Sequence, residues 1–372
     1  MIDLLYIVVF VLFQISFLLQ LYYTFVIHKR LSNYKVSDEI NPVINPVSII
    51  ICARNEQENL QKNLPLILEQ EYPDFEVVLV NDCSVDDSHL VLRELASKYK
   101  HLKVVTINEH ERFKHGKKFA VTLGIKAADN EHLLFTDADC RPFSALWLKR
   151  MQQNFSDDIE IVLGYSPYQR LNGFVNRLIR FETFYTALNY LAFTLQGTPY
   201  MGIGRNMAYK KSLFFRGKGF AAHMHILSGD DDLFVNQNAT PNNTVIEIHP
   251  ESHILSEPKK TFSEYFTQKL RHLGAGKAYK KSHQTMLTVQ ASSAIGFYLL
   301  LIGLIILQAQ WYLILSVYII RMSVLLIIYR PVFKKLACPD LIFWLPVFDF
   351  IYYIYILALS IVTLFKKKVK WK

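Results

Sequence analysis

Hydrophobic residues gather at the two ends of the chain, and a long polar stretch separates them. Residues 2–27 carry a single charged side chain, Asp3, over a run longer than the about 20 residues that a helix needs to cross a bilayer core. This run predicts a first membrane-spanning helix. Residues 45–265 are polar enough to fold in water and long enough for one large α/β domain. Three more apolar runs of spanning length follow, at about 286–307, 311–329 and 341–365.

A cleaved signal peptide is the alternative interpretation of the N-terminal run. The run has no basic start, its apolar stretch is long, and it lacks small residues at the spacing of a cleavage site. A helix that stays in the membrane is therefore favoured. His28, Lys29 and Arg30 follow it directly, and basic residues flank spanning helices on the cytoplasmic side. We therefore predict that the polar domain is cytoplasmic.

The C-terminal tail, residues 366–372, conflicts with three C-terminal crossings. It contains five lysines, and three crossings would place them on the outer side, against the same charge rule. Either the tail departs from the rule, or one of the apolar segments is re-entrant or interfacial. The sequence leaves both interpretations open.

Short apolar runs alternate with segments of helical pattern in the first part of the polar stretch. This spacing predicts strands joined by right-handed helical crossovers, and therefore an α/β domain with a mostly parallel sheet. Ligands bind beyond the carboxyl ends of the strands in such sheets. We predict strands at 47–53, 75–81, 102–107 and 132–136, and helices at 56–68, 85–99 and 117–128.

The formal net charge of +9 raises the question of nucleic-acid binding. Many of the cations lie beside the apolar runs, where anionic lipid attracts them, so we expect contact with membrane lipids and no nucleic acid. The four cysteines show no C-x-x-C spacing, which predicts neither a zinc site nor a disulfide framework. This usage fits a reducing cytosol.

Polar residues follow the first two predicted strands. Asn55 and Glu56 stand after the first strand in place of a glycine-rich turn, which excludes a dinucleotide fingerprint and a P-loop there. Asp82 ends the second strand, where a carboxylate can accept hydrogen bonds from a ribose or a base. Ser84 and Asp86 can equally cap the next helix, and capping is the better interpretation of this segment taken alone.

The fourth predicted strand ends in the pair Asp137 and Asp139. Two carboxylates two residues apart can point the same way and hold one hard cation, Mg²⁺ or Mn²⁺, that bridges to a diphosphate. A D-x-D triplet occurs by chance in many proteins. Its position after a buried strand, and before the turn at Cys140-Arg141-Pro142, is what favours a metal site.

Three further segments have both a functional and a plain interpretation. Lys117 begins a predicted helix, where a cation opposes the helix dipole unless an anion lies nearby; the alternative is a solvated basic patch. Residues 202–206 are a glycine turn whose arginine suits a phosphate, or simply a flexible loop. Residues 230–232 are three aspartates in a row, which need a cation or a proton, unless the turn is solvated. One of them can act as a general base that deprotonates a hydroxyl.

Two segments have the pattern of helices at a membrane surface. Residues 261–284 combine apolar and basic side chains at helical spacing and include Gln268 and Arg271, although a lipid-surface helix without a catalytic part is the alternative. Residues 174–195 are expected to form a second interfacial helix beside a hydrophobic acceptor.

The order of these motifs is similar to that of the family 2 glycosyltransferases, which are inverting, membrane-associated enzymes with the GT-A nucleotide-sugar fold. The resemblance covers about 45–275 and extends to the flanking helices. It implies a nucleotide-sugar donor and a divalent metal, Mg²⁺ or Mn²⁺. The residues implied are Asn55, Glu56, Asp82, Lys117 and Asp137 for the donor, Asp139 with Asp137 for the metal, and Gly202, Gly204 and Arg205 for the acceptor side.

The same resemblance implies a catalytic base in the acidic cluster, and we favour Asp231, then Asp230. Gln268 and Arg271 match the Q-x-x-R-W motif of the processive members, but His272 replaces the tryptophan, which puts processivity in doubt. The implied mechanism is a single in-line displacement with inversion. The cation and the side chains of Lys117 and Arg271 would stabilise the leaving diphosphate.

Two charges inside the C-terminal apolar runs are independent of this resemblance. Arg321 and Asp349 each lie eight residues from a predicted cytoplasmic end, near Tyr329 and Leu341, so both are about 12 Å deep at about 1.5 Å per residue. An unpaired charge there is costly. We predict an ion pair between these two side chains on antiparallel helices, near a lipid-phosphate acceptor. The alternative is that one of the side chains snorkels or faces a water-filled gap.

The sequence thus predicts a membrane-anchored glycosyltransferase that moves a sugar from a nucleotide-diphosphate sugar to a lipid or lipid-linked acceptor at the cytoplasmic face, in a bacterial inner membrane. A processive polysaccharide synthase and a non-catalytic nucleotide-binding membrane protein are the alternatives. The predicted divisions are a helix at 1–28, a linker at 29–46, the GT-A domain at 47–260, an interfacial helix at 261–284, spanning helices at 285–365 and a basic tail at 366–372.

Overall fold

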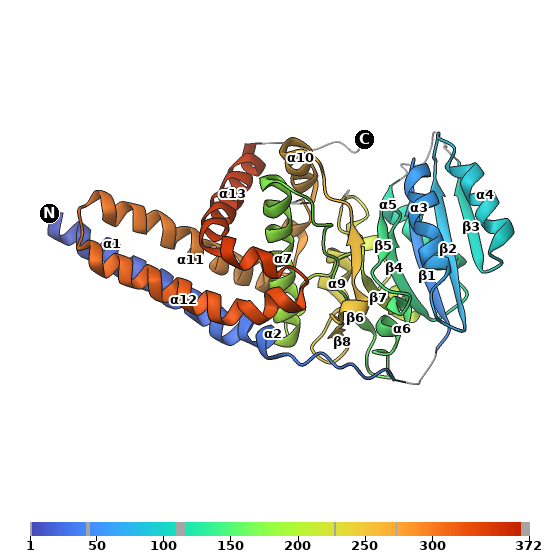
Figure 1. Cartoon of the computed structure of the whole chain (residues 1–372), viewed down its shortest axis with the longest axis horizontal. Helices are drawn as coiled ribbons and strands as arrows, with labels where there is room; N and C mark the ends of the chain where they lie inside the picture. The colour runs from blue at the N-terminus through green and yellow to red at the C-terminus, as the bar shows by residue number, and fades with distance from the viewer. Residues whose placement is uncertain (1, 42–44, 109–115, 227, 273, 366–372) are drawn as a thin grey trace.

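The polar domain is built on a seven-stranded sheet with the order β3-β2-β1-β4-β7-β6-β8 (Figure 1). The structure is a computed structural model that describes residues 2–41, 45–108, 116–226, 228–272 and 274–365. The strands are β1 Val47–Ala53, β2 Phe75–Asp82, β3 Leu102–Ile107, β4 His132–Asp137, β6 Ile161–Leu163, β7 Met207–Lys210 and β8 Thr244–Ile246, with β5 Cys140–Pro142 and β9 Ile254–Ser256 in a second, two-stranded sheet.

The predicted parallel α/β arrangement is confirmed. Strand β1 pairs in parallel with β2 and with β4, and β2 pairs in parallel with β3, so their carboxyl ends share one edge. Strand β7 runs antiparallel to its neighbours β4 and β6, which makes the far half of the sheet mixed. The crossovers are α3 Gln57–Leu68, α4 Ser88–Lys98 and α5 Lys117–Ala127, and the later helices of the domain are α6 Trp147–Gln152, α8 Lys211–Arg216, α9 Asp232–Asn238 and α10 Phe262–His272.

Alternate residues of β1 enter two different cores. Ile49 and Ile51 pack with Leu60 and Leu64 of α3 on one face, while Ile50 packs with Val121 of α5 on the other. A strand covered by helices on both faces reads as a continuous apolar run, and this explains why β1 shows little polar alternation. The sheet is therefore a rigid support, and the ends of its strands form a row that the helices leave open.

Helix α7, Phe174–Leu195, stands between the sheet and the apolar helices (Figure 1). It has the predicted bounds, but most of its side chains are buried by protein and few face outward. Tyr190 donates to the carbonyl of Gly164 in the sheet domain at 2.6 Å, while Asn189 on the same helix bonds Gln290 and His28 of the apolar helices. The helix therefore joins the two parts of the molecule rather than covering one of them at a lipid surface.

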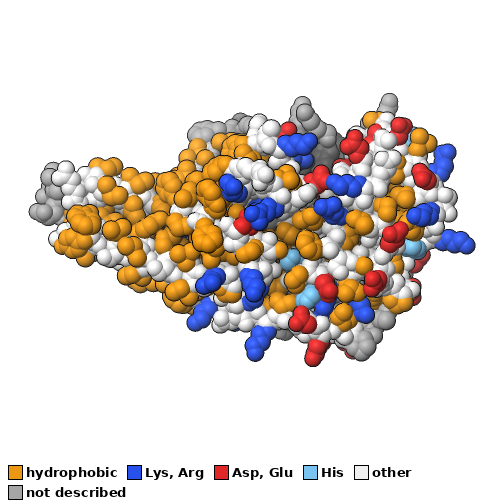
Figure 2. All heavy atoms as spheres, viewed as in Figure 1, with side chains coloured by type: hydrophobic (Ala, Val, Ile, Leu, Met, Phe, Trp, Pro, Cys, Tyr) orange, Lys and Arg blue, Asp and Glu red, His pale blue; other side chains and the backbone are white. Residues whose placement is uncertain are grey.

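Within the part of the chain that the structure describes, four helical segments are long and apolar enough to cross a membrane: Leu4–Asn33, Lys281–Ile306, Trp311–Lys335 and Pro339–Val362. Figure 2 shows hydrophobic side chains over the end of the molecule that these helices form, and charged ones over the sheet domain. The elements are α1 Ile2–Tyr22, the π-helix η1 Tyr23–His28, α2 Lys29–Asn33, α11 Lys281–Ile306, α12 Trp311–Lys335, the 3₁₀ helix η5 Pro339–Trp344 and α13 Leu345–Phe365.

Two predicted boundaries differ from the structure. The first helical segment continues past residue 28 to Asn33, and His28 is not a surface cation but a buried group within it, bonded to Asn189 and to Tyr329. The amphipathic helix ends at His272 rather than 284, since α11 already begins at Lys281. The tail, residues 366–372, lies outside the described residues.

The predicted ion pair between Arg321 and Asp349 is confirmed. Arg321 Nη1 lies 2.7 Å from Asp349 Oδ2, and the two side chains are 2% and 0% exposed. Gln20 of α1 accepts a hydrogen bond from Arg321 Nε at 2.6 Å, and Tyr298 of α11 donates to Asp349. The pair thus ties together all four apolar segments, which accounts for two charges in an environment where either one alone would be costly.

Candidate active site

The carboxyl ends of β1 and β4 open into a pocket beside the start of α5. Neighbouring parallel strands end at this edge, so residues far apart in sequence meet there. Apolar side chains and charged side chains both line it. The pocket is lined by Ile50, Cys52, Lys117, Val121, Phe135, Thr136, Asp137, Gly204, Met207, Tyr209 and Asp230.

The D-x-D carboxylates come together as predicted. Ligand atoms of Asp137, Asp139 and Cys140 lie within 4.8 Å of one another. Burial, and then the charge of Asp137, raise the pKa of Asp139, while Arg205 opposes that shift. Two carboxylates that repel each other in a partly dry site gain from a hard cation between them, so their oxygens fit Mg²⁺ or Mn²⁺. Cys140 fits less well, because it is buried, bonds Ser256 and has a pKa far above its usual value through burial.

Lys117 connects this pair to the acidic cluster. Its Nζ lies 2.9 Å from Asp137 Oδ1 and 3.2 Å from Asp230 Oδ2, so the predicted anion near the helix start consists of two carboxylates. Burial alone would lower the pKa of Lys117, but Asp137, Asp230 and Asp231 hold it well above its usual value. The ammonium group therefore stays charged and bridges β4 and the acidic cluster.

The three consecutive aspartates have three different environments. Asp231 is the N-cap of α9: its Oδ1 accepts from the backbone N–H of Asp232 at 2.8 Å, and its Oδ2 from that of Gly204 at 2.7 Å. Asp230 instead lines the pocket and faces Lys117. Burial, then the opposing charge of Lys117 and the added charge of Asp231, leave the pKa of Asp230 raised.

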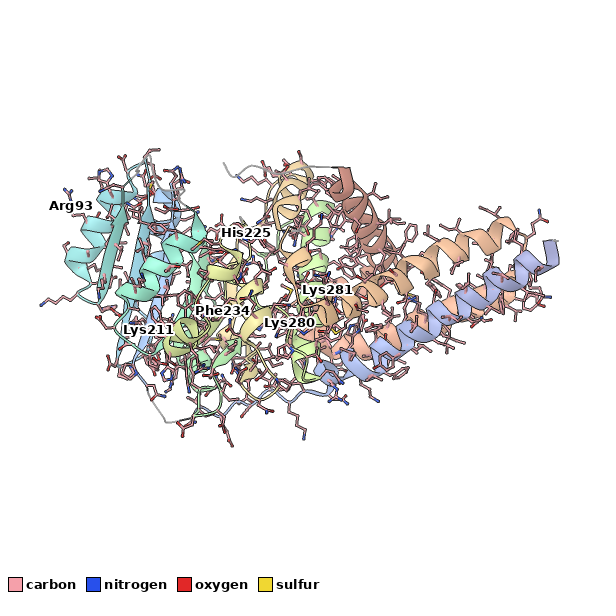
Figure 3. All side chains as sticks on the ribbon, turned by 180° about the vertical axis from the view of Figure 1, so that it is seen from behind. Arg93, Lys211, His225, Phe234, Lys280 and Lys281 are labelled. Carbon is pink, nitrogen blue, oxygen red and sulfur yellow. The ribbon has the colours of Figure 1, made fainter. Side chains whose placement is uncertain are left out.

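Asp232 points to the apolar helices. Tyr279, just before α11, donates its hydroxyl to Asp232 Oδ2 at 2.7 Å. Burial, followed by the charge of Asp231, raises the pKa of Asp232 to about 7. The backbone N–H of Lys280 donates to Asn236 of α9 at 2.8 Å, and Figure 3 labels Lys280 together with Phe234, a residue of the same helix as Asn236. The acidic cluster is thus attached to the start of α11.

The loop after β1 is held by the segment after β2. Asn55 has a positive φ of 56°, its Oδ1 accepts from the N–H of Val85 at 2.8 Å, and its N–H donates to Ser84. Asp86 accepts from the N–H of Gln57, the first residue of α3, at 3.1 Å. Capping is therefore the role of Asp86, although it caps α3 and not only the helix that follows it.

Asp82 has a different environment from Asp86. Its side chain is 6% exposed, and its Oδ1 forms no hydrogen bond among the described residues. A buried carboxylate oxygen without a partner is costly, and a ligand donor would satisfy it. Glu56 also has a raised pKa, first through burial and then through the charges of Asp139 and Asp137, against a hydrogen bond from Asn59. Glu56 therefore lies near the D-x-D pair, while Asp82 lies at the end of β2, the strand on the other side of β1 from β4.

The glycine turn at 202–206 packs closely against this cluster. A Cβ added to Gly204 would lie 3.2 Å from Asp231 Oδ2, and one added to Gly202 would lie 2.9 Å from Leu163. Arg205 stacks over the ring of Tyr168 at 4.6 Å. Burial opposes its charge, but Tyr168, Cys140, Asp137 and Asp139 raise its pKa. Arg205 therefore lies beside the D-x-D pair, whereas the sequence placed it on the acceptor side.

Helix α10 is fixed to α7 by one buried ion pair. Lys269 Nζ lies 2.7 Å from Glu182 Oε2. The next residue, Leu270, is buried. Gln268 is half-buried on this helix, and the side chain of Arg271 lies outside the described residues. The structure therefore places the helix but not the arginine.

Sequence reasoning missed two polar residues that shape the site. Lys118 donates to the carbonyls of His223 at 2.8 Å and of Ile226 at 2.9 Å, so it holds the loop before the acidic cluster. Tyr279 holds Asp232, as described above. The doubled lysine after Gly116 was a signal for Lys118, whereas no local pattern distinguishes Tyr279 from the other tyrosines of the chain.

A parallel α/β sheet with a D-x-D pair at its carboxyl edge and flanking apolar helices defines a GT-A-like, membrane-associated class of protein. Residues 48–216 match the profile of Glycosyl transferase family 2. The chain therefore carries a family 2 glycosyltransferase domain. The mannosyltransferase PcManGT from Pyrobaculum calidifontis, solved in complex with GDP-Man and Mn²⁺, has the same fold, with a TM-score of 0.60 at 17% identity over 94% of this chain and 99% of that one.

Curated relatives match over shorter segments. Glycosyltransferase AglE of Haloferax volcanii is 32% identical over 130 residues, which are 34% of this chain and 41% of that protein. A poly-beta-1,6-N-acetyl-D-glucosamine synthase of Staphylococcus epidermidis is 28% identical over 119 residues, 32% of this chain and 28% of that protein. The chain thus spans less than half the length of these relatives.

Proposed function

We propose that the protein is an inverting glycosyltransferase that moves a sugar from a nucleotide-diphosphate sugar to a lipid or lipid-linked acceptor, at the cytoplasmic face of a membrane. The observation that carries this proposal is the bridge from Asp137 through Lys117 to Asp230. It joins a candidate metal site and a candidate base within one pocket. Cytoplasmic placement is supported by Lys29 and Arg30, which are exposed where the first helix meets the domain.

The donor would lie along the strand ends. In this proposal Asp82, whose Oδ1 needs a donor, accepts from the nucleoside, while Asn55 and Glu56 form the neighbouring wall. Asp139 with Asp137 would hold Mg²⁺ or Mn²⁺, whose charge would offset that of the diphosphate. Support for the metal also comes from the Mn²⁺ in the PcManGT complex.

The cationic side chains would stabilise the departing diphosphate. Lys117 stays charged in the pocket, and Arg205 lies beside the same carboxylates, so both can face a negative leaving group. Gln268 and Arg271 would act from α10, as the family resemblance implies. We assign Arg205 to the donor side, while Gly202 and Gly204 remain on the acceptor side as the turn that contacts Asp231.

The catalytic base in this proposal is Asp230, with Asp231 as its support, the reverse of the order that the sequence favoured. Both carboxylate oxygens of Asp231 are held by backbone N–H groups. Asp230 instead faces the pocket, and its raised pKa makes it a better proton acceptor. It would take the proton of the acceptor hydroxyl as that oxygen attacks the anomeric carbon from the side opposite the diphosphate, which inverts the configuration.

The test is metal-dependent release of nucleoside diphosphate by the purified full-length protein in lipid nanodiscs, over a panel of nucleotide sugars. We expect turnover of at least one donor with Mn²⁺ or Mg²⁺ and its loss in Asp139→Asn. Asp158→Asn, at an exposed aspartate, is the matched control and should retain activity. No turnover of any donor with membrane lipid present would contradict the enzyme and support a non-catalytic membrane protein. Turnover that Asp139→Asn leaves unchanged would contradict the metal site.

A processive synthase is the second candidate, because a relative is a poly-N-acetylglucosamine synthase. The replacement of the motif tryptophan by His272 favours transfer of a single sugar. Product length separates the two functions: acceptor mass should rise by one sugar residue, whereas a ladder of masses would establish a polymerase.

A further inference from the structure

Helix α12 defines the two surfaces of the membrane. Trp311 and Tyr312 are 71% and 51% exposed at one end of it, and aromatic residues of this kind mark membrane–water interfaces. Arg330 and Lys334 are exposed near its other end, on the side of the sheet domain. At about 1.5 Å per residue, Trp311 and Arg330 are about 28 Å apart, close to the thickness of about 30 Å of a hydrocarbon core.

The segment from η5 to α13 begins at the domain side of this frame. Asp340 forms a two-pronged ion pair with Arg180 of α7, at 2.7 Å and 2.8 Å. Arg177, one turn earlier on α7, lies 5.0 Å from the ring of Trp344 at the end of η5. Both partners belong to α7, the helix that joins the sheet domain to the apolar helices, so η5 leaves from the interface on that side.

The segment then reaches its deepest described contact at Asp349. Its partner Arg321 lies nine residues from Arg330, and therefore about 13 Å inside the hydrocarbon core along α12. Tyr298, which also bonds Asp349, lies far along α11 from Lys281, the domain-side residue labelled in Figure 3. The start of α13 is thus well inside the membrane.

Later turns of α13 lie nearer the sheet domain than Asp349 does. Tyr355 stacks on Tyr265 of α10, with ring centroids 6.2 Å apart. Leu359 shares one buried apolar cluster with Tyr265 and with Ile179, the residue of α7 next to Arg180. Helix α10 is amphipathic and bears the Lys269 ion pair to α7, so it lies at the membrane surface rather than within the hydrocarbon core.

These contacts exclude a crossing by a straight helix. Asp340 and Leu359 are 19 residues apart, which is about 28 Å in a helix that crosses, yet Asp340 pairs with Arg180 of α7 and Leu359 belongs to the buried cluster that contains the adjacent Ile179. Asp349 lies between them in sequence and deeper than both. Figure 1 agrees, since α13 runs across the long bundle of α1, α11 and α12 and ends beside α10.

The outer face of this segment is a single apolar stripe. Phe343, Val347, Phe350, Ile354 and Ile361 are 87%, 49%, 38%, 39% and 47% exposed. Their spacing of three, four or seven residues places those of α13 on one side of the helix, opposite the buried residues that pack on α7 and α10. A face of this kind needs an apolar partner, and the acyl chains around the bundle supply one.

We propose that residues 339–365 are a re-entrant segment that enters and leaves the leaflet next to the sheet domain, with its exposed stripe against the acyl chains of that leaflet. Three segments then cross the membrane, and the chain leaves α13 on the side of the sheet domain. The lysines that follow Phe365 in the sequence exit on the same side as Lys29 and Arg30, which removes the conflict with the charge rule.

The first test is the sidedness of single cysteines added to the full-length protein in intact cells. A cysteine appended after Lys372 is compared with Ser97→Cys on the sheet domain and with Gln310→Cys between α11 and α12, both exposed. The label is a membrane-impermeant maleimide, and peptide mapping locates it. We expect the C-terminal cysteine to be protected or labelled together with residue 97. Labelling together with residue 310 would overturn the proposal.

The second test measures depth along α13, so that it does not depend on the tail. Val347→Cys, Ile354→Cys and Ile361→Cys, all at exposed positions, carry a fluorophore in vesicles of phosphatidylcholines brominated at different acyl carbons. The re-entrant segment predicts that depth falls steadily from residue 347 to residue 361. A spanning helix places residue 354 deepest with shallower positions on either side, and that order would refute the proposal.

Discussion

Asp230 and Asp231 are adjacent residues at the start of α9, so variants of each can test which of them is the proposed catalytic base and which only supports it. The perturbation is Asp230→Asn compared with Asp231→Asn, which have the same chemistry one position apart. Asp231 accepts one backbone N–H on each carboxylate oxygen, from Gly204 and from Asp232. Asp230 faces Lys117 across the pocket at 3.2 Å. The two substitutions therefore remove different interactions.

The expected magnitudes follow from these contacts. Asparagine at position 231 keeps one carbonyl oxygen but turns an NH₂ group toward the other backbone N–H, and an unsatisfied donor costs about 1–3 kcal/mol of unfolding free energy. Asparagine at position 230 leaves the cap intact but cannot accept the proton. General-base catalysis contributes about 10²–10⁴-fold to rate, which is about 3–5 kcal/mol of activation free energy. Asp230→Asn should thus lose rate, and Asp231→Asn mainly stability.

The assay pairs kcat for release of nucleoside diphosphate with thermal unfolding. Unfolding is followed by reaction of the buried thiols of Cys140 and Cys338 with a maleimide dye. We expect Asp230→Asn to lose at least 100-fold in kcat, on the order of that general-base contribution, at an unchanged transition temperature. If instead Asp231→Asn is inactive but stable while Asp230→Asn turns over normally, the reasoning from the hydrogen bonds of Asp231 is refuted.

Three further outcomes test the site and the bundle. Asp139→Asn should raise the Mn²⁺ concentration needed for half-maximal donor binding, measured by calorimetry, and an unchanged requirement would exclude it as a ligand. The pKa of Asp232 is raised to about 7, so the folded state disfavours its charge and loses stability as pH rises from about 4 to about 7. Asp232→Asn should flatten that decline in transition temperature, and an equally steep decline in the variant would contradict this role of Asp232. Arg321→Leu or Asp349→Leu alone should destabilise the folded protein by about 3–5 kcal/mol, and the double variant by much less, since a buried charge is then no longer left unpaired. Reversing both charges should likewise restore the expression that either single reversal loses. Additive losses would argue against coupling between the two residues.

Much of the fold was predictable because it depends on local periodicity. The strands at 47–53 and 102–107 have the predicted bounds, since an apolar run this short between turn-forming residues fits a strand better than a helix. The helix at 174–195 was also located to the residue. Its surroundings were not, because an apolar face does not indicate whether lipid or protein will cover it.

The sequence by itself determined the parallel α/β domain, the apolar ends, the D-x-D pair and the Arg321–Asp349 ion pair, all of which follow from residue type and spacing. Only the tertiary structure separated the environments of Asp230 and Asp231, since Lys117 lies opposite Asp230 and Gly204 opposite Asp231. It also supplies the contacts on which the proposed course of residues 339–365 rests, because hydropathy measures the length of an apolar helix and not its direction. The direction of the segment is set by contacts near its two ends. Asp340 pairs with Arg180 of α7, and Tyr355 stacks on Tyr265 of α10. Both contacts join residues that are far apart in sequence.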